Sequence, residues 1–592
     1  MRSAACFCLL ILFFGCGEKS EEKEKRLSLP QDTSPVQVEM IGDIDPIANP
    51  NAVKGGTFTT WGSSFPKSLN MFLDYNSFSE EVTGLLFEPL AELHSTRNEP
   101  IGVLAESWQI SDDKTTFTFK IHPEARWSDG KAVTAEDIQF YYDVMMNPKN
   151  MTSIFRVSLK RFDRPRIVDD RTIEISAKTP HWKNFWDACD MTALPRHIWN
   201  EVDFNRQNFE FPVVSGPYML KEVKKNRNIT LERRTDWWGR IKRYNQHKFN
   251  FDIIRYRFME DRNKALEAFK KGEFDAYAIY TSSIWAKKTD FNQIEKGWVV
   301  KQRVYNKEPK GFQGFAINMR RPVFQDAKVR EALSHLLNRE SMNEKLMFNE
   351  YFLLNSYYSD LYPENRNPDV PLRGYDPEKA RVLLHDAGWV VGDDGFLIKD
   401  GDYLEIKFLT YSVDLRHLNI YLEDLKKVGI KAGVDQLSLS SVRKRLDNHD
   451  FDLFWVNWGA SRLRDPEAMW HSGTADQIAT NNYSGVKDSV IDGLIEAQKT
   501  EMDLDRRNEI LKKIDMKLNE IIPYIFLWQA DHNRMLYWNR FGTPRHVFDK
   551  FNRENVAIIY WWMDPEKDRA LKMAMENGTV LSRLPERVVY AE

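Results

Sequence analysis

The chain contains 592 residues, too many for one hydrophobic core, so we expect several domains. Hydrophobic residues make up 42% and charged residues 29%, which is an ordinary globular mixture. The 84 Lys and Arg residues nearly balance the 87 Asp and Glu residues, so a net charge of −3 gives no electrostatic case for a nucleic acid partner.

An apolar run near the N-terminus predicts export. Arg2 precedes eleven nearly all apolar residues, 4–14, a run too short to span a bilayer and typical of a signal-peptide core. A small residue followed directly by Cys16 then resembles a lipobox, in which Cys16 is lipidated and begins the mature chain. Two Phe residues depart from the usual pattern, so plain secretion and a retained anchor stay open. We expect a signal peptide over 1–15 and a charged, lipid-anchored tether over 16–40, in the periplasm or at the cell surface.

Cysteine usage excludes an internal disulfide in the mature chain. Cys6 and Cys8 leave with the signal peptide and Cys16 is the predicted lipid acceptor, so only Cys189 remains. The 12 His residues show no paired ligand spacing. We therefore expect no metal and no cofactor.

Helix and strand signals alternate along the chain and predict mixed α/β domains. Apolar and polar residues alternate over 116–121, as in a half-buried strand, and a turn at Asp112-Asp113 pairs it with a strand at 107–110. Capping signals and apolar spacing predict helices that begin at Thr134, Asp326 and Asp376, and a further helix over 415–425. Short apolar runs over 453–456 and 524–528 predict buried strands.

Several blocks in register resemble family 5 of the extracellular solute-binding proteins, the oligopeptide and dipeptide binders. The blocks, which together cover about residues 54 to 530, are 104–108, 112–113, 117–119, 127–130, 133–137, 215–218, 318–338, 375–380 and 388–389. Within the family, residues 54–57, 482–488 and 492–495 look most like the microcin-C-type oligopeptide binders.

The resemblance implies a two-lobed, three-domain clamshell that closes around a ligand. The predicted domain I is discontinuous, with domain II and domain III inserted: 41–75, 212–308 and 530–592 form domain I, 76–211 domain II and 309–529 domain III. The implied function is to capture oligopeptides as a monomer and deliver them to the membrane permease of an ATP-binding-cassette importer, without catalysis. A carrier of a nickel chelate, haem or oligosaccharide with the same fold is the alternative. The sequence contains no nucleophile elbow, phosphate loop or zinc-protease motif, which disfavours a hydrolase.

The candidate ligand site follows the buried strand 453–456, because ligand clefts open at the carboxyl ends of such strands. It comprises Trp458, Gly459, Ala460 and Ser461. Peptide binders of the family place an Asp three residues after this Trp to hold the peptide's α-ammonium group, and Ser461 replaces it here. We therefore expect little dependence on a free peptide N-terminus.

Further candidates flank this loop, each with a structural alternative. Asp465 either takes over the acidic clamp or caps the helix that Pro466 begins. Arg462 and Arg464 either hold a ligand carboxylate or phosphate, or are solvated charges. Four more residues are predicted to contact the peptide or line the cleft, although each one alone is more often structural: Asn482, Tyr483, Asn70 and Tyr75.

Overall fold

The computed structural model describes residues 43–591. The predicted signal peptide (1–15), Cys16 and the tether (16–40) lie outside the described residues. Within residues 43–591, every helix is too short or too polar to cross a membrane. Cys189, the cysteine in this part of the chain, is buried with a free thiol.

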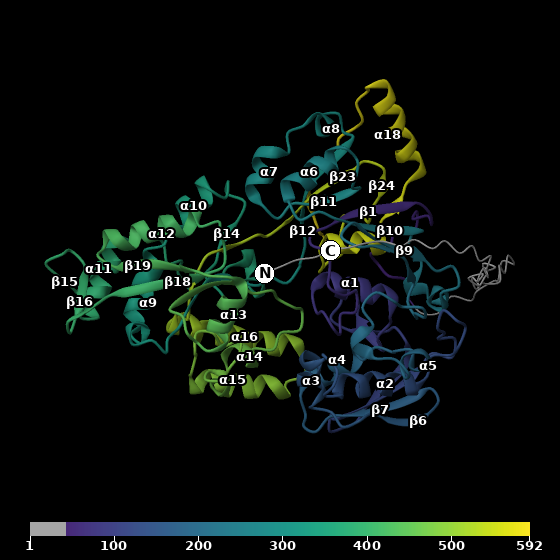
Figure 1. Cartoon of the computed structure of the whole chain (residues 1–592), viewed down its shortest axis with the longest axis horizontal. Helices are drawn as coiled ribbons and strands as arrows, with labels where there is room; N and C mark the ends of the chain where they lie inside the picture. The colour runs from purple at the N-terminus through teal and green to yellow at the C-terminus, as the bar shows by residue number, and fades with distance from the viewer. Residues whose placement is uncertain (1–42, 592) are drawn as a thin grey trace, which may run out of the picture. The chain divides into compact units, whose positions relative to one another are not determined.

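The largest sheet has eight strands in the order β26-β12-β23-β11-β1-β10-β9-β8 and collects segments from widely separated parts of the chain (Figure 1). Strand β1 lies near its centre and pairs in parallel with both β10 and β11, so Thr60 lies beside Tyr256 and Ala276. The strands are β1 (Thr57–Gly62), β8 (Tyr218–Lys224), β9 (Asn228–Arg233), β10 (Ile253–Phe258), β11 (Ala276–Ala278), β12 (Val299–Tyr305), β23 (Asn533–Trp538) and β26 (Arg587–Val589).

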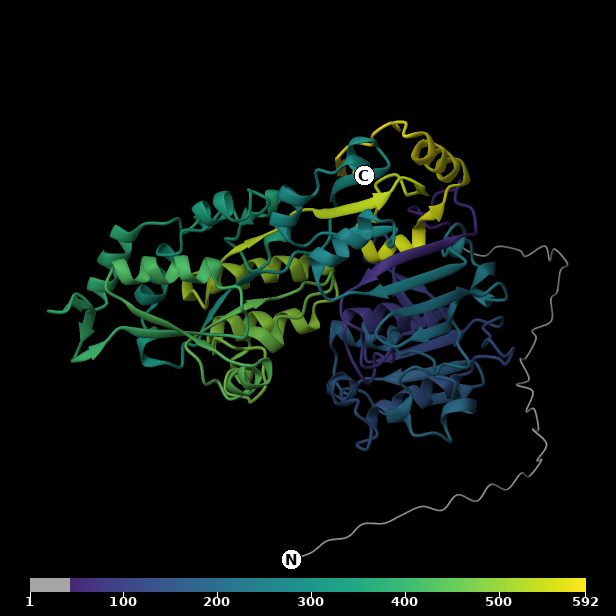
Figure 2. The ribbon, with the colours of Figure 1, turned by 45° about the horizontal axis from the view of Figure 1, so that its top comes forward.

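A four-stranded antiparallel sheet, β4-β5-β7-β6, follows early in the chain and appears in blue in Figure 2. Its strands are β4 (Ala105–Ile110), β5 (Thr116–Ile121), β6 (Arg166–Asp169) and β7 (Thr172–Ser176). The predicted pairing of β4 with β5 is confirmed, with Trp108 opposite Phe119. The capping box predicted at Thr134 is also confirmed, because Thr134 and Asp137 cap helix α2 (Ala135–Met146) reciprocally. Three short helices complete this part: α3 (Ser153–Leu159), α4 (Trp182–Cys189) and α5 (Arg196–Trp199).

The third sheet has five strands in the order β19-β18-β20-β13-β21. They are β13 (Gln313–Ile317), β18 (Glu405–Thr410), β19 (Lys431–Gln436), β20 (Leu453–Asn457) and β21 (Tyr524–Phe526). The predicted buried strand is confirmed as β20, which lies in the middle of the sheet between parallel β18 and antiparallel β13. The buried strand predicted over 524–528 is present as β21 but is shorter than predicted. The chain leaves the sheet after Phe526, and the separate strand β22 (Trp528–Gln529) pairs with β14 (Phe352–Leu353).

The three helices predicted in this part of the chain are all present. They are α9 (Ala327–His335), capped by Asp326; α11 (Pro377–Asp386), capped by Asp376; and α12 (Arg416–Lys427). Gly429 then adopts φ +87°, a left-handed conformation that glycine tolerates without strain, and the chain turns into β19. Each of the three large sheets draws its strands from the segments predicted for one domain, while the domain boundaries themselves stay predictions.

The remaining helices cover the sheets or connect them. They are α1 (Ser77–Leu86), α6 (Arg262–Lys270), α7 (Ser282–Lys288), α8 (Asn292–Glu295), α10 (Arg339–Lys345), α13 (Leu439–Asp447), α14 (Glu467–Trp470), α15 (Ser489–Thr500), α16 (Leu504–Ile521), α17 (Ala557–Tyr560) and α18 (Pro565–Asn577). Three small sheets complete the fold. Two are strand pairs: β2 (Ala91–Leu93) with β3 (Pro100–Gly102), and β24 (Phe541–Gly542) with β25 (Trp562–Met563). The third has three strands, in which β16 (Leu397–Lys399) lies between β15 (Val390–Val391) and β17 (Asp402–Tyr403).

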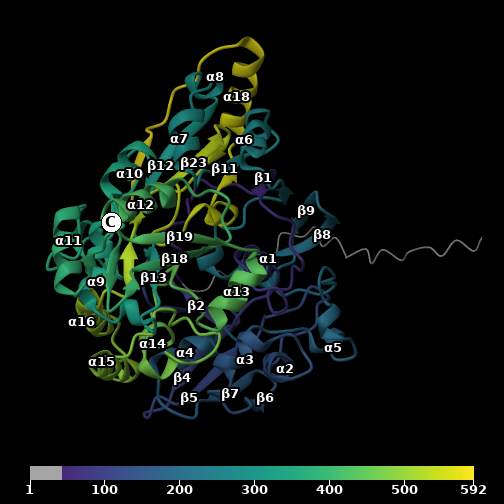
Figure 3. The same cartoon turned by 60° about the vertical axis from the view of Figure 1, so that its left-hand side comes forward.

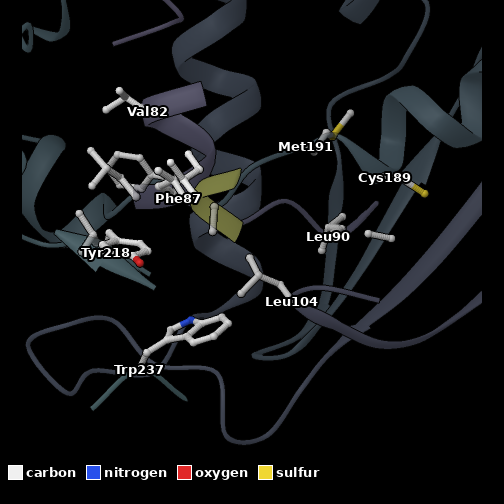
Figure 4. Close-up of a cluster of buried hydrophobic side chains, with 14 of the residues drawn as sticks. Val82, Phe87, Leu90, Leu104, Cys189, Met191, Tyr218 and Trp237 are labelled. Atoms are coloured by element: carbon white, nitrogen blue, oxygen red, sulfur yellow. The ribbon is translucent and has the colours of Figure 1, made fainter. Parts of the chain in front are cut away.

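One large hydrophobic core joins the eight-stranded and four-stranded sheets, and a second core fills the space around the five-stranded sheet. Figure 4 shows part of the first core, where Phe87 at the end of α1 lies near Tyr218 of β8, with Leu90 and Leu104 close by. All four side chains are at least 98% buried. Burying Phe or Leu stabilises a fold by about 1.5–3 kcal/mol each, so α1 is held firmly where it meets the sheet.

The helices α4 and α15 pack against each other (Figures 1 and 3). The indole nitrogen of Trp182 donates to the side-chain oxygen of Gln498 at 3.0 Å, and the guanidinium of Arg507 stacks over the Trp182 ring at 4.3 Å. These contacts connect the part of the chain that carries the four-stranded sheet to the helices beside the five-stranded sheet.

Candidate functional site

The loop that follows β20 is fixed at its start by two hydrogen bonds from Trp458 and by a close backbone approach at Gly311. The Trp458 N–H donates to the carbonyl of Phe312 at 2.9 Å, and the indole nitrogen donates to the Tyr524 hydroxyl at 3.1 Å. The backbone at Gly311 passes so close that a methyl group added there would lie 1.7 Å from the Trp458 carbonyl oxygen. Only glycine therefore allows the loop this path.

Ala460, Ser461 and Arg462 then line a cavity of about 760 Å³. Ser461 is exposed, and its hydroxyl accepts a hydrogen bond from the Leu463 N–H at 3.2 Å. Arg462 donates to the carbonyl of His94 at 2.8 Å, and its guanidinium lies 4.6 Å from the centre of the Phe551 ring. Arg462 thus connects this loop to the segment that follows β2.

The two charged residues further along the loop have protein partners. Arg464 forms an ion pair with Asp360, and both side chains are largely buried. Asp465 accepts a hydrogen bond from the Glu467 N–H at 3.1 Å, which is the contact expected of a residue that caps a helix start. Neither residue is among those lining the cavity, and a ligand contact by either stays a prediction.

The remaining predicted residues are likewise absent from the cavity wall. Asn482 is buried and bonds both the N–H and the carbonyl of Val486, while Tyr483 lies against the Trp458 ring at 5.5 Å. Asn70 is buried and donates to the Gln207 carbonyl at 3.0 Å. Tyr75 is 53% exposed and contacts the edge of Phe155. A ligand role for these four also stays a prediction.

The opposite wall of the cavity consists of residues that the sequence did not single out. Trp61 at the end of β1, Phe78 and Glu81 on α1, Tyr256 on β10 and Tyr280 after β11 contribute to it. Further along the chain, Phe551, Arg553 and Glu554 close it. Trp61, Tyr256 and Tyr280 come together because β1 pairs with β10 and β11, a non-local contact that no local sequence pattern predicts. The spacing of Phe78 and Glu81 on one helix face is the only local signal among these residues.

The charged groups of this wall have unequal surroundings. The Tyr256 hydroxyl donates to Glu81 at 2.6 Å, and the Tyr280 hydroxyl donates to Glu554. Burial raises the pKa of Glu81 to about 7; the bond from Tyr256 opposes this rise and the charge of Glu554 adds to it. Arg553, by contrast, forms an ion pair with Glu308.

One group of three side chains has the composition of a metal site but not its chemistry. Ligand atoms of His181, Asp465 and Glu467 lie within 4.8 Å of one another. However, the Nδ1 atom of His181 accepts a hydrogen bond from the Lys183 N–H at 3.0 Å, so the neutral ring carries its proton on Nε2. A histidine that ligates a metal donates from its second nitrogen instead, so these residues do not fit a metal ion.

Comparison with known proteins agrees with the fold. The model of "Bacterial extracellular solute-binding proteins, family 5 Middle" matches residues 99–480. The "Probable peptide-binding protein YejA" of Agrobacterium fabrum is 27% identical over 84% of this chain and 88% of its own length.

Two solved structures are also similar. AppA from Bacillus subtilis, in complex with a nonapeptide, has a TM-score of 0.67 at 24% identity and covers 86% of this chain and 99% of its own. NikZ from Campylobacter jejuni, in complex with Ni(L-His), has a TM-score of 0.68 at 22% identity with the same coverage. The predicted family and the mixed α/β fold of oligopeptide-binding proteins are confirmed.

Proposed function

Because this chain belongs to family 5 of the bacterial extracellular solute-binding proteins, we propose that it captures oligopeptides in the 760 Å³ cavity and delivers them to the permease of an ATP-binding-cassette importer. As a solute-binding component of a transporter, it is not an enzyme, which agrees with the sequence prediction. The family's description as extracellular agrees with the predicted export.

The observation that carries the proposal is the construction of the cavity. Its volume is within the range of about 300–1,000 Å³ that small-ligand sites occupy. Aromatic rings, carboxylates, guanidinium groups and hydroxyls all line it, which suits a ligand with a polar backbone and varied side chains. The peptide-binding description of YejA and the nonapeptide held by AppA support the same ligand class.

A nickel chelate is the alternative that the likeness to NikZ suggests. Among the described residues that line the cavity there is no His, Cys or Met, and imidazole or sulfur ligands are those that nickel sites favour. A chelate such as Ni(L-His) brings its own donor atoms, so this absence argues only against a bare nickel ion. We prefer the peptide proposal because YejA is described as peptide-binding and AppA holds a nonapeptide.

A thermal-shift screen tests the ligand class. Peptide mixtures, Ni(L-His), haem and oligosaccharides are each added to the purified protein, and a peptide at a hundredfold excess over its Kd should stabilise the fold by about 2.7 kcal/mol. The cavity-filling variant Ser461→Trp should lose this response. Ser582→Trp, at an exposed position outside the cavity, is the matched control and should keep it. A response to Ni(L-His), haem or sugar alone would reject the peptide proposal.

We also propose that Cys16 carries the lipid that keeps the protein at the membrane, because it follows a small residue at the end of an apolar run. Cys16→Ala should then either release the protein from membranes or leave the precursor unprocessed. Membrane fractionation and mass spectrometry of the N-terminus measure this. A variant that is processed normally and stays membrane-bound would contradict the anchor.

A further inference from the structure

Two carboxylates in the cavity wall form no ion pair with a basic side chain of the described residues. Glu81 is bonded to the Tyr256 hydroxyl and Glu554 to the Tyr280 hydroxyl. Within residues 43–591, no Lys, Arg or His forms an ion pair with either carboxylate, although ion pairs are frequent elsewhere in this part of the chain. A tyrosine hydroxyl can donate one hydrogen bond to a carboxylate but cannot neutralise its charge.

The arginines of the same cavity are engaged by other groups. Arg553 forms an ion pair with Glu308, which also pairs with Lys310 at 3.1 Å. Arg462 donates to the His94 carbonyl at 2.8 Å, and Arg262 donates to the Thr281 hydroxyl at 3.2 Å. The Arg553 charge still acts on Glu554, but none of these arginines forms an ion pair or hydrogen bond with the Glu81 or Glu554 carboxylate.

Aromatic rings surround these carboxylates. Helix α1 carries Phe78 and Glu81 three residues apart, so the ring and the carboxylate share one helix face. The Phe78 ring meets the Tyr256 ring edge-on at 4.9 Å, and Trp61 and Tyr280 line the same cavity. A ring face attracts a cation, and a carboxylate forms a strong charge-assisted hydrogen bond with one.

We propose that Glu81 and Glu554, with the aromatic residues around them, form a subsite that binds a cationic nitrogen group of the peptide ligand. The group is either the peptide's α-ammonium or a Lys or Arg side chain. This inference rests on the proposed function, because it names the part of a peptide that the cavity selects. It also provides an acidic contact in the cavity although Ser461 replaces the family's acidic residue in the loop after β20.

The raised pKa of Glu81 supports this assignment. Burial and the neighbouring Glu554 charge make the ionised form costly in the free protein, despite the bond from Tyr256. Tyr280 faces the same pair, the Arg553 charge acts on Glu554, and the Arg262 guanidinium lies over the Tyr280 ring at 5.9 Å. A bound cation would favour ionised Glu81, so binding should release a proton and the affinity should rise as the pH passes 7.

Four matched peptide libraries test the subsite by calorimetry. The parent library consists of pentapeptides with Lys at the centre and equimolar mixtures of Ala, Leu, Phe and Ser at the other positions. The four forms are the parent, its N-acetylated form, a form in which norleucine replaces Lys, and a form with both changes. We expect the doubly changed form to bind wild type at least tenfold more weakly than the unmodified form. The single change that removes the docked cation should account for this loss and identify its source.

The variants Glu81→Gln and Glu554→Gln should reduce that difference to less than threefold, and Glu124→Gln, an exposed control, should retain it. If the four forms bind wild type equally, or if both cavity variants keep the tenfold difference, the cation subsite is rejected while peptide binding stands. If no form binds and Ni(L-His), haem or an oligosaccharide does, the proposed function itself fails.

Discussion

Glu350 and Glu81 are carboxylates in opposite electrostatic surroundings. Glu350 lies 2.8 Å from Arg303, 3.0 Å from the Nε2 atom of His532 and 3.5 Å from Arg534. Burial acts to raise its pKa, but the hydrogen bonds from His532 and Arg303 and the charges of Arg303 and Arg534 lower it to about 2. Glu81 has a tyrosine hydroxyl and another glutamate as neighbours, and its pKa rises to about 7.

The difference separates a structural carboxylate from one available to a ligand. Arg303 belongs to β12 and Arg534 to β23, whereas Glu350 follows α10, so this cluster ties the eight-stranded sheet to the segment leading to β14. Its charges are already matched within the protein. The charge of Glu81 is unmatched and faces a cavity, where a solute can supply the missing cation.

Removing the charge of Glu350 should have the largest effect. Glu350→Gln removes the carboxylate that Arg303, Arg534 and His532 share. Arg303 keeps Glu586 and His532 keeps Asp531, but the buried Arg534 loses its acidic partner, which should lower the free energy of unfolding by about 3–5 kcal/mol. Urea unfolding at pH 7 measures this change. A loss below 1 kcal/mol would show that the cluster is not structural.

The stability of the wild-type protein should fall at acid pH because Glu350 becomes protonated. The folded-state pKa of Glu350, about 2, lies below its ordinary value of 4.5, so its contribution is complete above pH 4.5 and is lost as the pH falls towards 2. The loss should be roughly 3 kcal/mol. Unfolding curves from pH 5 to 3 should therefore be steeper in pH for wild type than for Glu350→Gln, and equal slopes would contradict the assignment.

Ligand affinity should depend on pH through Glu81. A Lys-containing peptide should bind about tenfold more tightly at pH 8 than at pH 6, corresponding to about 1.4 kcal/mol, because the cation requires the ionised carboxylate. Calorimetry in buffers of different ionisation enthalpy should show proton release at pH 6.5. If the affinity of wild type does not change with pH, or if its pH dependence persists in Glu81→Gln, then ionisation of Glu81 does not control peptide binding.

The smallest expected effect is on the stability of the free protein. A carboxyl whose folded-state pKa is raised from 4.5 to about 7 costs stability progressively as the pH rises between these values. The full shift would correspond to about 3 kcal/mol at pH 8. Because Glu81 is only half-buried and solvent screens its charge, Glu81→Gln should raise the free energy of unfolding by about 1 kcal/mol, the opposite sign to Glu350→Gln. Thermal unfolding without peptide measures this change in stability. If Glu81→Gln destabilised the protein, the proposed difference between the Glu81 and Glu350 surroundings would be contradicted.

The sequence predicted the elements whose signals are local. Thr134 caps α2, Asp376 and Pro377 begin α11, and the apolar run at 453–456 became the central strand β20. The strand in the run 524–528 is shorter than predicted because the apolar residues of the run pair in two different sheets, which tertiary contacts decide.

Only part of the candidate site could be predicted from local sequence signals. Ala460, Ser461 and Arg462 line the cavity and directly follow a recognisable strand. Glu81 and Glu554 lie far apart in the chain and come together through the parallel pairing of β1 with β10 and β11 and the return of the C-terminal segment. Non-local pairing leaves no periodicity that a single sequence displays.

Mass spectrometry of the solute that co-purifies with the protein from its native host tests the central claim most directly. The account predicts peptides that carry a free amino group or a Lys or Arg residue, retained by wild type and lost from Ser461→Trp. Retention of a nickel chelate, haem or an oligosaccharide in place of peptides would contradict it.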